Sequence, residues 1–261
     1  MGGLLTVPIT WLVARAWRRS QGRKFKRVFG LEVDEFHLAY GSLVIRPEIM
    51  DLLASVQHGE NYRSFPFAKP SIPEVALRSE SVAPGCEIRA AAYVANALGR
   101  FSRIRSSVMA DEAIKDRLDL DFISFGMNSN LKTLDLCKNR ANCFADFDRQ
   151  GNTFVGKRDG EIIYQAAPSY DFGLIIKIHP EQYPHRTWIA CAGNGEWGTS
   201  GTAYFLANKW SDLLSYLNGK DKSFTTKLRR RLIREDRGFL AVIRVEIGKD
   251  ESAALVAFYE D

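Results

Sequence analysis

The sequence predicts an α/β fold in which a mixed, mainly parallel sheet carries helices on both faces and is extended by antiparallel hairpins. Short apolar runs alternate with helical patterns in the first half of the chain, as in a parallel sheet. Residues 153–165, which contain an Asp-Gly turn, and residues 239–259 have the pattern of hairpins. A glycine-rich loop follows a short apolar run at 188–192 and precedes a helix, an arrangement that suits a ligand loop.

The other elements follow from their own apolar patterns. The expected strands are 36–43, 104–109, 120–125, 174–178 and 188–192. The expected helices are 47–56, 84–101, 131–137 and one that Thr199 or Ser200 caps and that continues to Leu217. Residues 57–85 are rich in proline and are interpreted as a long irregular connection.

The first 30 residues differ in composition from the rest. They carry seven basic residues and no acid, so residues 31–261 hold a charge of −2 within the total of +5. Residues 4–17 are apolar except for two threonines and one arginine. We therefore expect residues 1–30 to be a membrane anchor that spans or lies on the bilayer through residues 4–27, or a helix packed on the domain. In the anchored arrangement the basic flank places residues 31–261, a single α/β domain, on the cytoplasmic side and makes the protein membrane-associated.

Composition also argues against several classes of function. A domain near neutrality is not typical of a general nucleic-acid binder, because phosphate contacts dominate such affinity. The four cysteines lack close-pair spacing and the four histidines are scattered, so no metal site is predicted. The basic run at 220–237 is interpreted as a solvated face, with contact to an anionic lipid or ligand or to nucleic acid as the alternatives. The sequence predicts no particular oligomeric state.

Residues 187–210 contain the most specific pattern in the chain. Gly193, Gly195 and Gly198 have the spacing of the dinucleotide fingerprint, but the nearest later acid, Asp212, falls inside the predicted helix. A glycine loop before a helix exposes backbone N–H groups, and the helix dipole favours an anion there. The pattern is compatible with an NAD or FAD site, with another Rossmann-like anion or nucleotide site, or with a tight turn that lets the helix pack on the sheet.

Three loops are expected at one edge of the sheet, after the strands at 36–43, 120–125 and 188–192. Ligands in open α/β sheets bind outside the carboxyl ends of the strands, so these loops supply the candidate ligand-binding residues. The candidates are Gly41, Ser42, Gly126, Asn128, Ser129, Asn130, Gly193, Asn194, Gly195, Gly198, Thr199 and Ser200. Asn128 and Asn130 either donate amides to a ligand or satisfy the backbone of the turn.

The loop at 193–199, GNGEWGT, resembles the phosphate loops of Rossmann-like nucleotide-binding domains, a group with lysine-decarboxylase-like and DprA-like members. The resemblance covers this motif with its flanking strand and helix. It implies a Rossmann-like fold and a nucleotide or phosphoribosyl ligand. The enzymes of that group have a glutamate on the helix, where this chain has Thr202 and Ala203, so no activity is carried over.

No nucleophile–base pair is visible from spacing. Asp171 and Glu196 are the carboxylates expected to act as acid or base or to bind ribose, although Asp171 is equally suited to cap a loop. Three functions follow, with binding favoured over catalysis. The first is a membrane-tethered domain that binds a nucleotide or related phosphate ligand as a sensor, and the second a hydrolase that cleaves a glycosidic or phosphoester bond in a nucleotide. The third is a non-catalytic interaction protein.

Overall fold

The computed structural model describes residues 6–44, 81–102, 104–139, 145–148, 153–156, 162–218 and 236–260. The helix predicted at 47–56, most of the irregular connection at 57–85 and most of the basic run at 220–237 lie outside these ranges.

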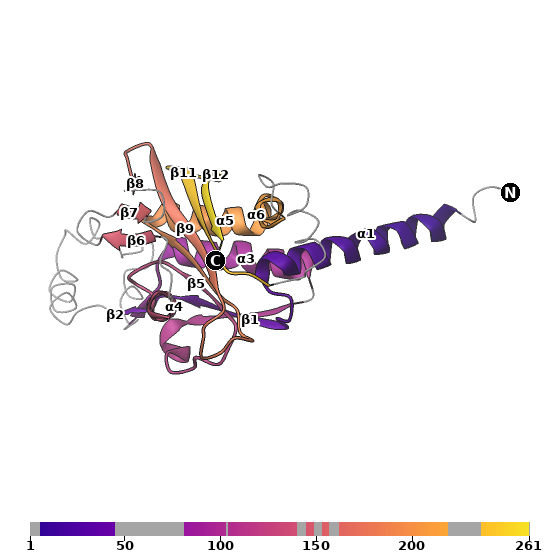
Figure 1. Cartoon of the computed structure of the whole chain (residues 1–261), viewed down its shortest axis with the longest axis horizontal. Coiled ribbons are helices and arrows are strands. Elements are labelled where there is room, and N and C mark those ends of the chain that lie inside the picture. The colour runs from indigo at the N-terminus through magenta and orange to yellow at the C-terminus, as the bar shows by residue number, and fades with distance from the viewer. Residues whose placement is uncertain are drawn as a thin grey trace, which may run out of the picture.

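A seven-stranded sheet forms the centre of the protein (Figure 1). In spatial order its strands are β12 (Lys249–Glu260), β11 (Phe239–Glu246), β9 (Tyr170–Ile178), β10 (Trp188–Gly193), β5 (Phe122–Phe125), β1 (Glu35–Tyr40) and β4 (Arg105–Ala110). A strand is therefore present at each predicted position, although the one predicted at 36–43 ends at Tyr40. β9 begins at Tyr170 rather than at residue 174, because Tyr170 and Asp171 pair with the end of β11.

The sheet is parallel on one side and antiparallel on the other. β10, β5, β1 and β4 run parallel to one another, whereas β9, β11 and β12 form antiparallel pairs. The prediction of a mixed α/β sheet is confirmed, with the parallel part confined to four strands. The hairpin predicted at 239–259 extends this sheet as β11 and β12.

Four helices cover one face of the sheet: α3 (Gly85–Phe101), α5 (Glu196–Asn208), α6 (Trp210–Leu217) and the end of α1 (Thr6–Phe29). Strand side chains alternate between the faces, so Ile189 and Cys191 of β10 meet these helices while Trp188 points to the other side. The rings of Phe25 and Trp210 lie 5.5 Å apart and join α1 to α6.

The other face is covered by α4 (Leu131–Lys138), by the short helix η3 (Asp111–Ile114) and by a three-stranded sheet. This sheet consists of β6 (Ala145–Asp148), β7 (Thr153–Gly156) and β8 (Ile162–Gln165). The hairpin predicted at 153–165 thus forms, but in a separate sheet rather than as an addition to the main one. Its Phe154 and Tyr164 are buried in the apolar cluster of this face, which explains its position. A further small ladder pairs β2 (Leu43–Val44) with β3 (Ser81–Val82).

The last turns of α1 belong to the packed domain. Phe25, Val28 and Phe29 are fully buried, and Lys26 Nζ donates to the Val33 carbonyl at 3.2 Å. For the end of α1, the arrangement is the expected alternative of a helix packed on the domain, because the apolar core includes these side chains. Figure 1 shows the rest of α1 extending away from the body. Among the described residues, no helix has the length and apolarity that crossing a membrane requires.

Candidate functional site

The three predicted loops lie at the same edge of the main sheet. β1, β5 and β10 are parallel, so their carboxyl ends share one edge, and the start of β9 and the turn between β11 and β12 also lie there. The strand order reverses between β1 and β5, because β1 leads through α3 to β4 while β5 leads through α4 towards the opposite side. Such a reversal is the usual ligand position in open α/β sheets.

Glu87, in the first turn of α3, joins the loops that follow β1 and β5. Its carboxylate accepts hydrogen bonds from the Gly41 amide and from Ser129 Oγ, the latter at 2.7 Å. The side chain is buried, and burial raises the pKa of the carboxyl above its ordinary value. Gly126 has a φ of +85°, and a Cβ there would overlap the Glu87 carboxylate. The two loops are therefore closed around a buried acid.

A second buried carboxylate, Asp111 of η3, connects the same two loops. Its Oδ1 accepts from the Ser42 amide at 2.9 Å, and its Oδ2 accepts from the Leu131 amide at 2.8 Å. The Ser42 backbone is thus held in place from within the protein, while its side chain is half-buried.

Asn130 has a structural role rather than a ligand-facing one. Its Nδ2 donates to the carbonyls of Ala39 and Phe125 at 2.8 and 2.9 Å, and its Oδ1 accepts from the Lys132 amide as the N-cap of α4. The side chain is fully buried. The alternative in which the asparagine satisfies the turn backbone therefore applies to Asn130, whereas Asn128 is exposed at the edge.

Close backbone approach explains the glycines that follow β10. A Cβ on Gly193 would overlap the Thr199 amide, and a Cβ on Gly198 would overlap the carbonyl oxygen of Phe172. The Gly193 amide donates to Thr199 Oγ1 at 3.1 Å. These glycines let the start of α5 pack against β9 and β10, as the tight-turn interpretation predicts.

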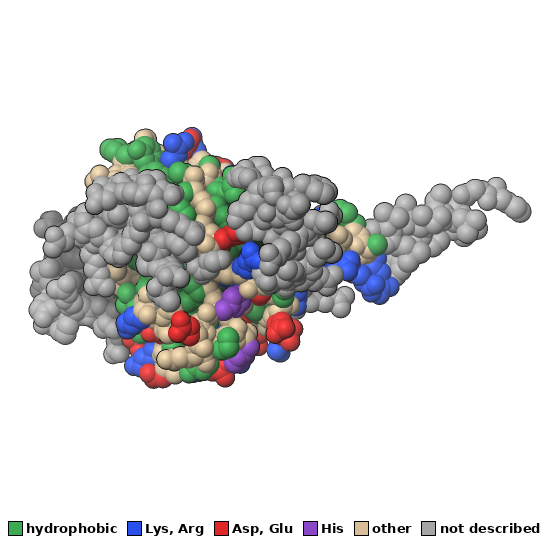
Figure 2. Space-filling view, viewed as in Figure 1, with side chains coloured by type: hydrophobic (Ala, Val, Ile, Leu, Met, Phe, Trp, Pro, Cys, Tyr) green, Lys and Arg blue, Asp and Glu red, His purple; other side chains and the backbone are tan. Residues whose placement is uncertain are grey.

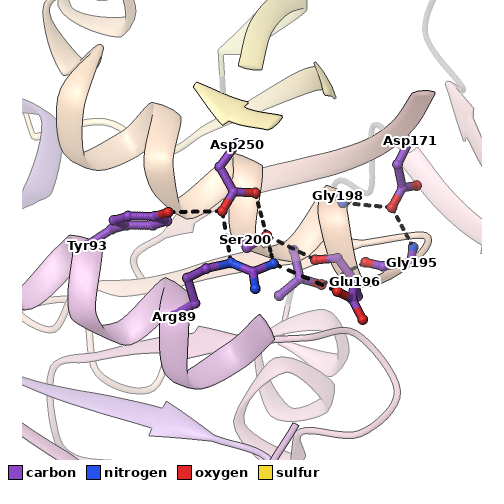
Figure 3. Close-up of polar contacts among 9 residues, drawn as sticks. Arg89, Tyr93, Asp171, Gly195, Glu196, Gly198, Ser200 and Asp250 are labelled. Atoms are coloured by element: carbon purple, nitrogen blue, oxygen red, sulfur yellow. Dashed lines mark hydrogen bonds and ion pairs between the residues drawn. The ribbon is translucent and has the colours of Figure 1, made fainter. Parts of the chain in front are cut away.

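The Asp171 carboxylate of β9 accepts hydrogen bonds from backbone amides of the glycine loop (Figure 3). Its Oδ2 accepts from the Gly195 and Gly198 amides at 3.1 and 2.6 Å, and its Oδ1 accepts from the Phe172 amide at 2.8 Å. The carboxyl is buried, and burial raises its pKa although these amides favour the charged form. With both oxygens engaged, Asp171 acts as the cap of α5, which differs from the acid–base role predicted for it.

The start of α5 also differs from the prediction. The helix begins at Glu196 with Gly195 as its N-cap, so Thr199 and Ser200 lie inside it instead of capping it. The Thr199 hydroxyl donates back to the Gly195 carbonyl at 3.2 Å. A capping oxygen from another strand, that of Asp171, removes the need for a side-chain cap within the helix sequence.

Arg89 of α3 faces the N-terminus of α5 (Figure 3). Its Nε donates to Asp250 Oδ2 and its Nη2 to Ser200 Oγ, both at 2.9 Å. Ser200 Oγ donates in turn to Asp250 Oδ1 at 2.6 Å, and the Tyr93 hydroxyl donates to Asp250 Oδ2 at 3.0 Å. Because Asp250 and Ser200 are buried, this network fixes the guanidinium between α3, α5 and β12.

The outer side of the guanidinium reaches solvent. The Arg89 side chain is 34% exposed and lies over the Trp197 ring, 4.7 Å from its centroid. Glu196 Oε1 is 3.9 Å from Nη2, and its side chain is 60% exposed. Within the described part of the chain, Arg89 Nη1 donates no hydrogen bond. A cation, a carboxylate and an aromatic ring thus meet at the start of α5.

Sequence reasoning did not identify Glu87 or Arg89 as site residues, and it gave Trp197 only a surface role in the interaction-protein alternative. Glu87 looked like an ordinary first-turn acid that the helix dipole favours, and the partners of Arg89 lie far away in the sequence. Of the predicted ligand-binding residues, three reach the surface of this edge: Asn128, Asn194 and Gly195. Three glycines are buried instead and allow close backbone packing: Gly126, Gly193 and Gly198. Asn194 Nδ2 donates to the Tyr164 carbonyl, while its buried Oδ1 has no partner among the described residues.

Thiol or metal chemistry gains no support at this edge. Burial, with the neighbouring Glu87 charge, raises the pKa of Cys86 to about 11, so the thiol stays protonated at neutral pH. Within the described ranges, no three His, Cys, Asp or Glu side chains are grouped so that they could hold a metal ion.

Comparison of the chain with models of known protein families, with curated proteins and with solved structures finds no match.

Proposed function

We propose that the carboxyl edge of the main sheet binds a nucleotide or a related phosphate-bearing small molecule, with the phosphate held by Arg89. The observation that supports this proposal is that the Arg89 guanidinium is held in place on one side and reaches solvent on the other. It is fixed by Asp250 and Ser200, is one-third exposed, and keeps Nη1 without a partner among the described residues. A pre-positioned fork with a free donor suits a phosphate oxygen.

The N-terminus of α5 adds to this attraction for an anion. The Gly195 and Gly198 amides already donate to Asp171, so our proposal puts the phosphate outside the glycine loop. The Glu196 and Trp197 amides are in the first turn and donate no hydrogen bond to the described residues. The helix dipole favours negative charge at this position. Because Glu196 and Asp250 carry negative charge close to Arg89, we expect a monophosphate to bind better than a triphosphate.

The neighbouring groups suit the rest of a nucleotide. Glu196 is an exposed carboxylate that can accept hydrogen bonds from ribose hydroxyls, and Trp197 offers an aromatic surface beside the guanidinium. The reversal of strand order between β1 and β5 supports a Rossmann-like description of the parallel half.

The test is calorimetric titration and thermal unfolding of the full-length chain with AMP, ribose 5-phosphate, adenosine, ATP and inorganic phosphate. A phosphate-bearing ligand should raise the melting temperature, since a concentration of 100 Kd adds about 2.7 kcal/mol to the unfolding free energy. Arg89→Lys keeps the charge opposite Asp250 but loses the fork, and should weaken binding by about tenfold or more. Arg100→Lys, an exposed position further along α3, is the matched control. No stabilisation by any of these compounds at millimolar concentration would overturn the proposal.

A second candidate is hydrolysis of the bound nucleotide, and the exposure of Glu196 favours it. An accessible carboxylate 3.9 Å from a guanidinium is placed to act as a base beside a phosphate or ribose. Product analysis after incubation with nucleotides should then show cleavage that Glu196→Gln abolishes while binding persists. Cleavage unchanged in Glu196→Gln removes this residue from the mechanism.

A further inference from the structure

The first half of α1 extends beyond the part of the helix that packs on the domain (Figure 1). The packed part comprises Phe25, Val28 and Phe29, with Gly22 close to the Phe101 carbonyl. Before this point the described side chains turn outward, and Trp17 is 62% exposed. Trp17 therefore presents its aromatic ring to solvent on a part of the helix that the domain does not cover.

Basic side chains surround α1 where it leaves the body. Arg19, Arg23 and Lys24 are exposed, and residues 1–30 contain no acidic residue. Figure 2 shows Lys and Arg side chains gathered on this part of the helix. Exposed positive charge of this kind is complementary to an anionic surface.

The sequence before these exposed basic residues is apolar. Residues 7–17 contain one threonine and one arginine, and the remainder are apolar, including Trp11 and Trp17. Eleven helical residues are about 16 Å long, roughly half of the 30 Å hydrocarbon core of a bilayer. This length fits one leaflet, with Trp17 at the depth of the headgroups and the basic residues that follow it outside the hydrocarbon.

We infer that the segment 7–17 of α1 inserts into one leaflet of an anionic lipid membrane, with the exposed side chains of Arg19, Arg23 and Lys24 bound to its headgroups. The inference does not depend on the proposed ligand site. In Figure 1, β2, which follows the carboxyl end of β1, lies at the opposite end of the molecule from the start of α1. A protein bound through α1 therefore presents the ligand edge away from the membrane.

The experiment is flotation of the full-length protein with vesicles of phosphatidylcholine alone and with 30% phosphatidylserine, at 50 and 500 mM salt. Binding is expected for the anionic vesicles at low salt and should weaken at high salt. Arg19→Glu should weaken binding by about tenfold or more, because each basic residue near the surface contributes to attraction. Lys138→Glu changes the net charge equally at an exposed position of α4 and should leave binding unchanged.

Tryptophan quenching by vesicles with brominated acyl chains tests the insertion itself. Wild-type fluorescence should be quenched, and Trp17→Phe, at an exposed position where folding is not at risk, should lose part of the quenching. Failure to float with anionic vesicles at 50 mM salt overturns the inference. So does a salt-independent dimer, seen by light scattering, that Trp17→Ser dissociates, since a second copy would then cover the helix.

Discussion

Asp171 Oδ2 accepts a hydrogen bond from the Gly198 amide at 2.6 Å, so a carboxylate of the chain itself occupies the position that the glycine motif offers to a ligand. The motif is therefore a packing and capping device. Its glycines allow close backbone contact, and its amides satisfy a buried acid. The ligand position that we propose lies beside this loop, at Arg89, whose Nη1 donates no hydrogen bond to the residues that the structure describes.

Replacement of the capping carboxylate should destabilise the protein. In Asp171→Asn one oxygen becomes an NH₂ group, which faces backbone N–H groups and cannot accept from them. A buried donor without an acceptor costs about 1–3 kcal/mol, so chemical denaturation should show a loss of this size. Glu181→Gln, at an exposed loop position, should change stability by less than about 0.5 kcal/mol. An unchanged midpoint for Asp171→Asn would contradict the capping role.

Two glycines should respond to alanine in opposite directions. A Cβ on Gly198 would lie 2.9 Å from the Gly193 Cα and overlap the Phe172 carbonyl, so Gly198→Ala should destabilise by about 1–3 kcal/mol or more. Gly99 lies in α3 with nothing within 4 Å of an added Cβ, so Gly99→Ala should stabilise by up to about 1 kcal/mol. Thermal unfolding of the pair measures both effects. Equal shifts in the two variants would show that close packing at Gly198 is not the constraint.

Local pattern was sufficient to predict most elements of the sheet and its helices. Apolar runs such as Trp188–Ala192 are short and bounded by turn residues, and helix α3 has strong helix formers throughout. The local sequence is therefore enough to predict each of these elements. The separate sheet around Phe154 and Tyr164 was not predictable in this way. A hairpin pattern fixes the pairing of its two strands, but the layer in which it packs depends on distant apolar residues.

The candidate site was predicted in position but not in detail. Parallel strands bring the loops after β1, β5 and β10 to one edge whatever their residues are, so the edge followed from topology. The roles of Asp171 and Arg89 depend on partners far away in the chain, Gly198 and Asp250 among them. Such contacts leave no periodic or spacing signal, which is why the helix cap was placed at Thr199 or Ser200.

The buried acid between the first two loops should make stability depend on pH. Burial raises the pKa of Glu87 above its ordinary value of 4.5, so the folded state holds this proton more tightly than the unfolded state. The contribution of Glu87 to stability is then fully present below pH 4.5 and is lost as the pH rises through the raised pKa. In Glu87→Gln this loss is absent, so its stability relative to wild type should improve as the pH rises from 4.5. Urea unfolding from pH 4 to 8 measures the difference in unfolding free energy between each variant and wild type. For the exposed Glu181→Gln this difference should stay constant with pH. A constant difference for Glu87→Gln as well would contradict a raised pKa for Glu87.

The final prediction concerns where the domain begins. Removal of residues 1–30 deletes Phe25, Val28 and Phe29, which are fully buried against α3 and α6. Loss of one buried phenylalanine side chain costs about 3–5 kcal/mol, and a whole domain is stable by only about 5–15 kcal/mol. The truncated chain should therefore fail to fold, as circular dichroism and hydrogen exchange would show. Removal of residues 1–13 keeps these side chains and should preserve the melting temperature. If the chain lacking residues 1–30 unfolds cooperatively at the full-length melting temperature, the end of α1 is not part of the core.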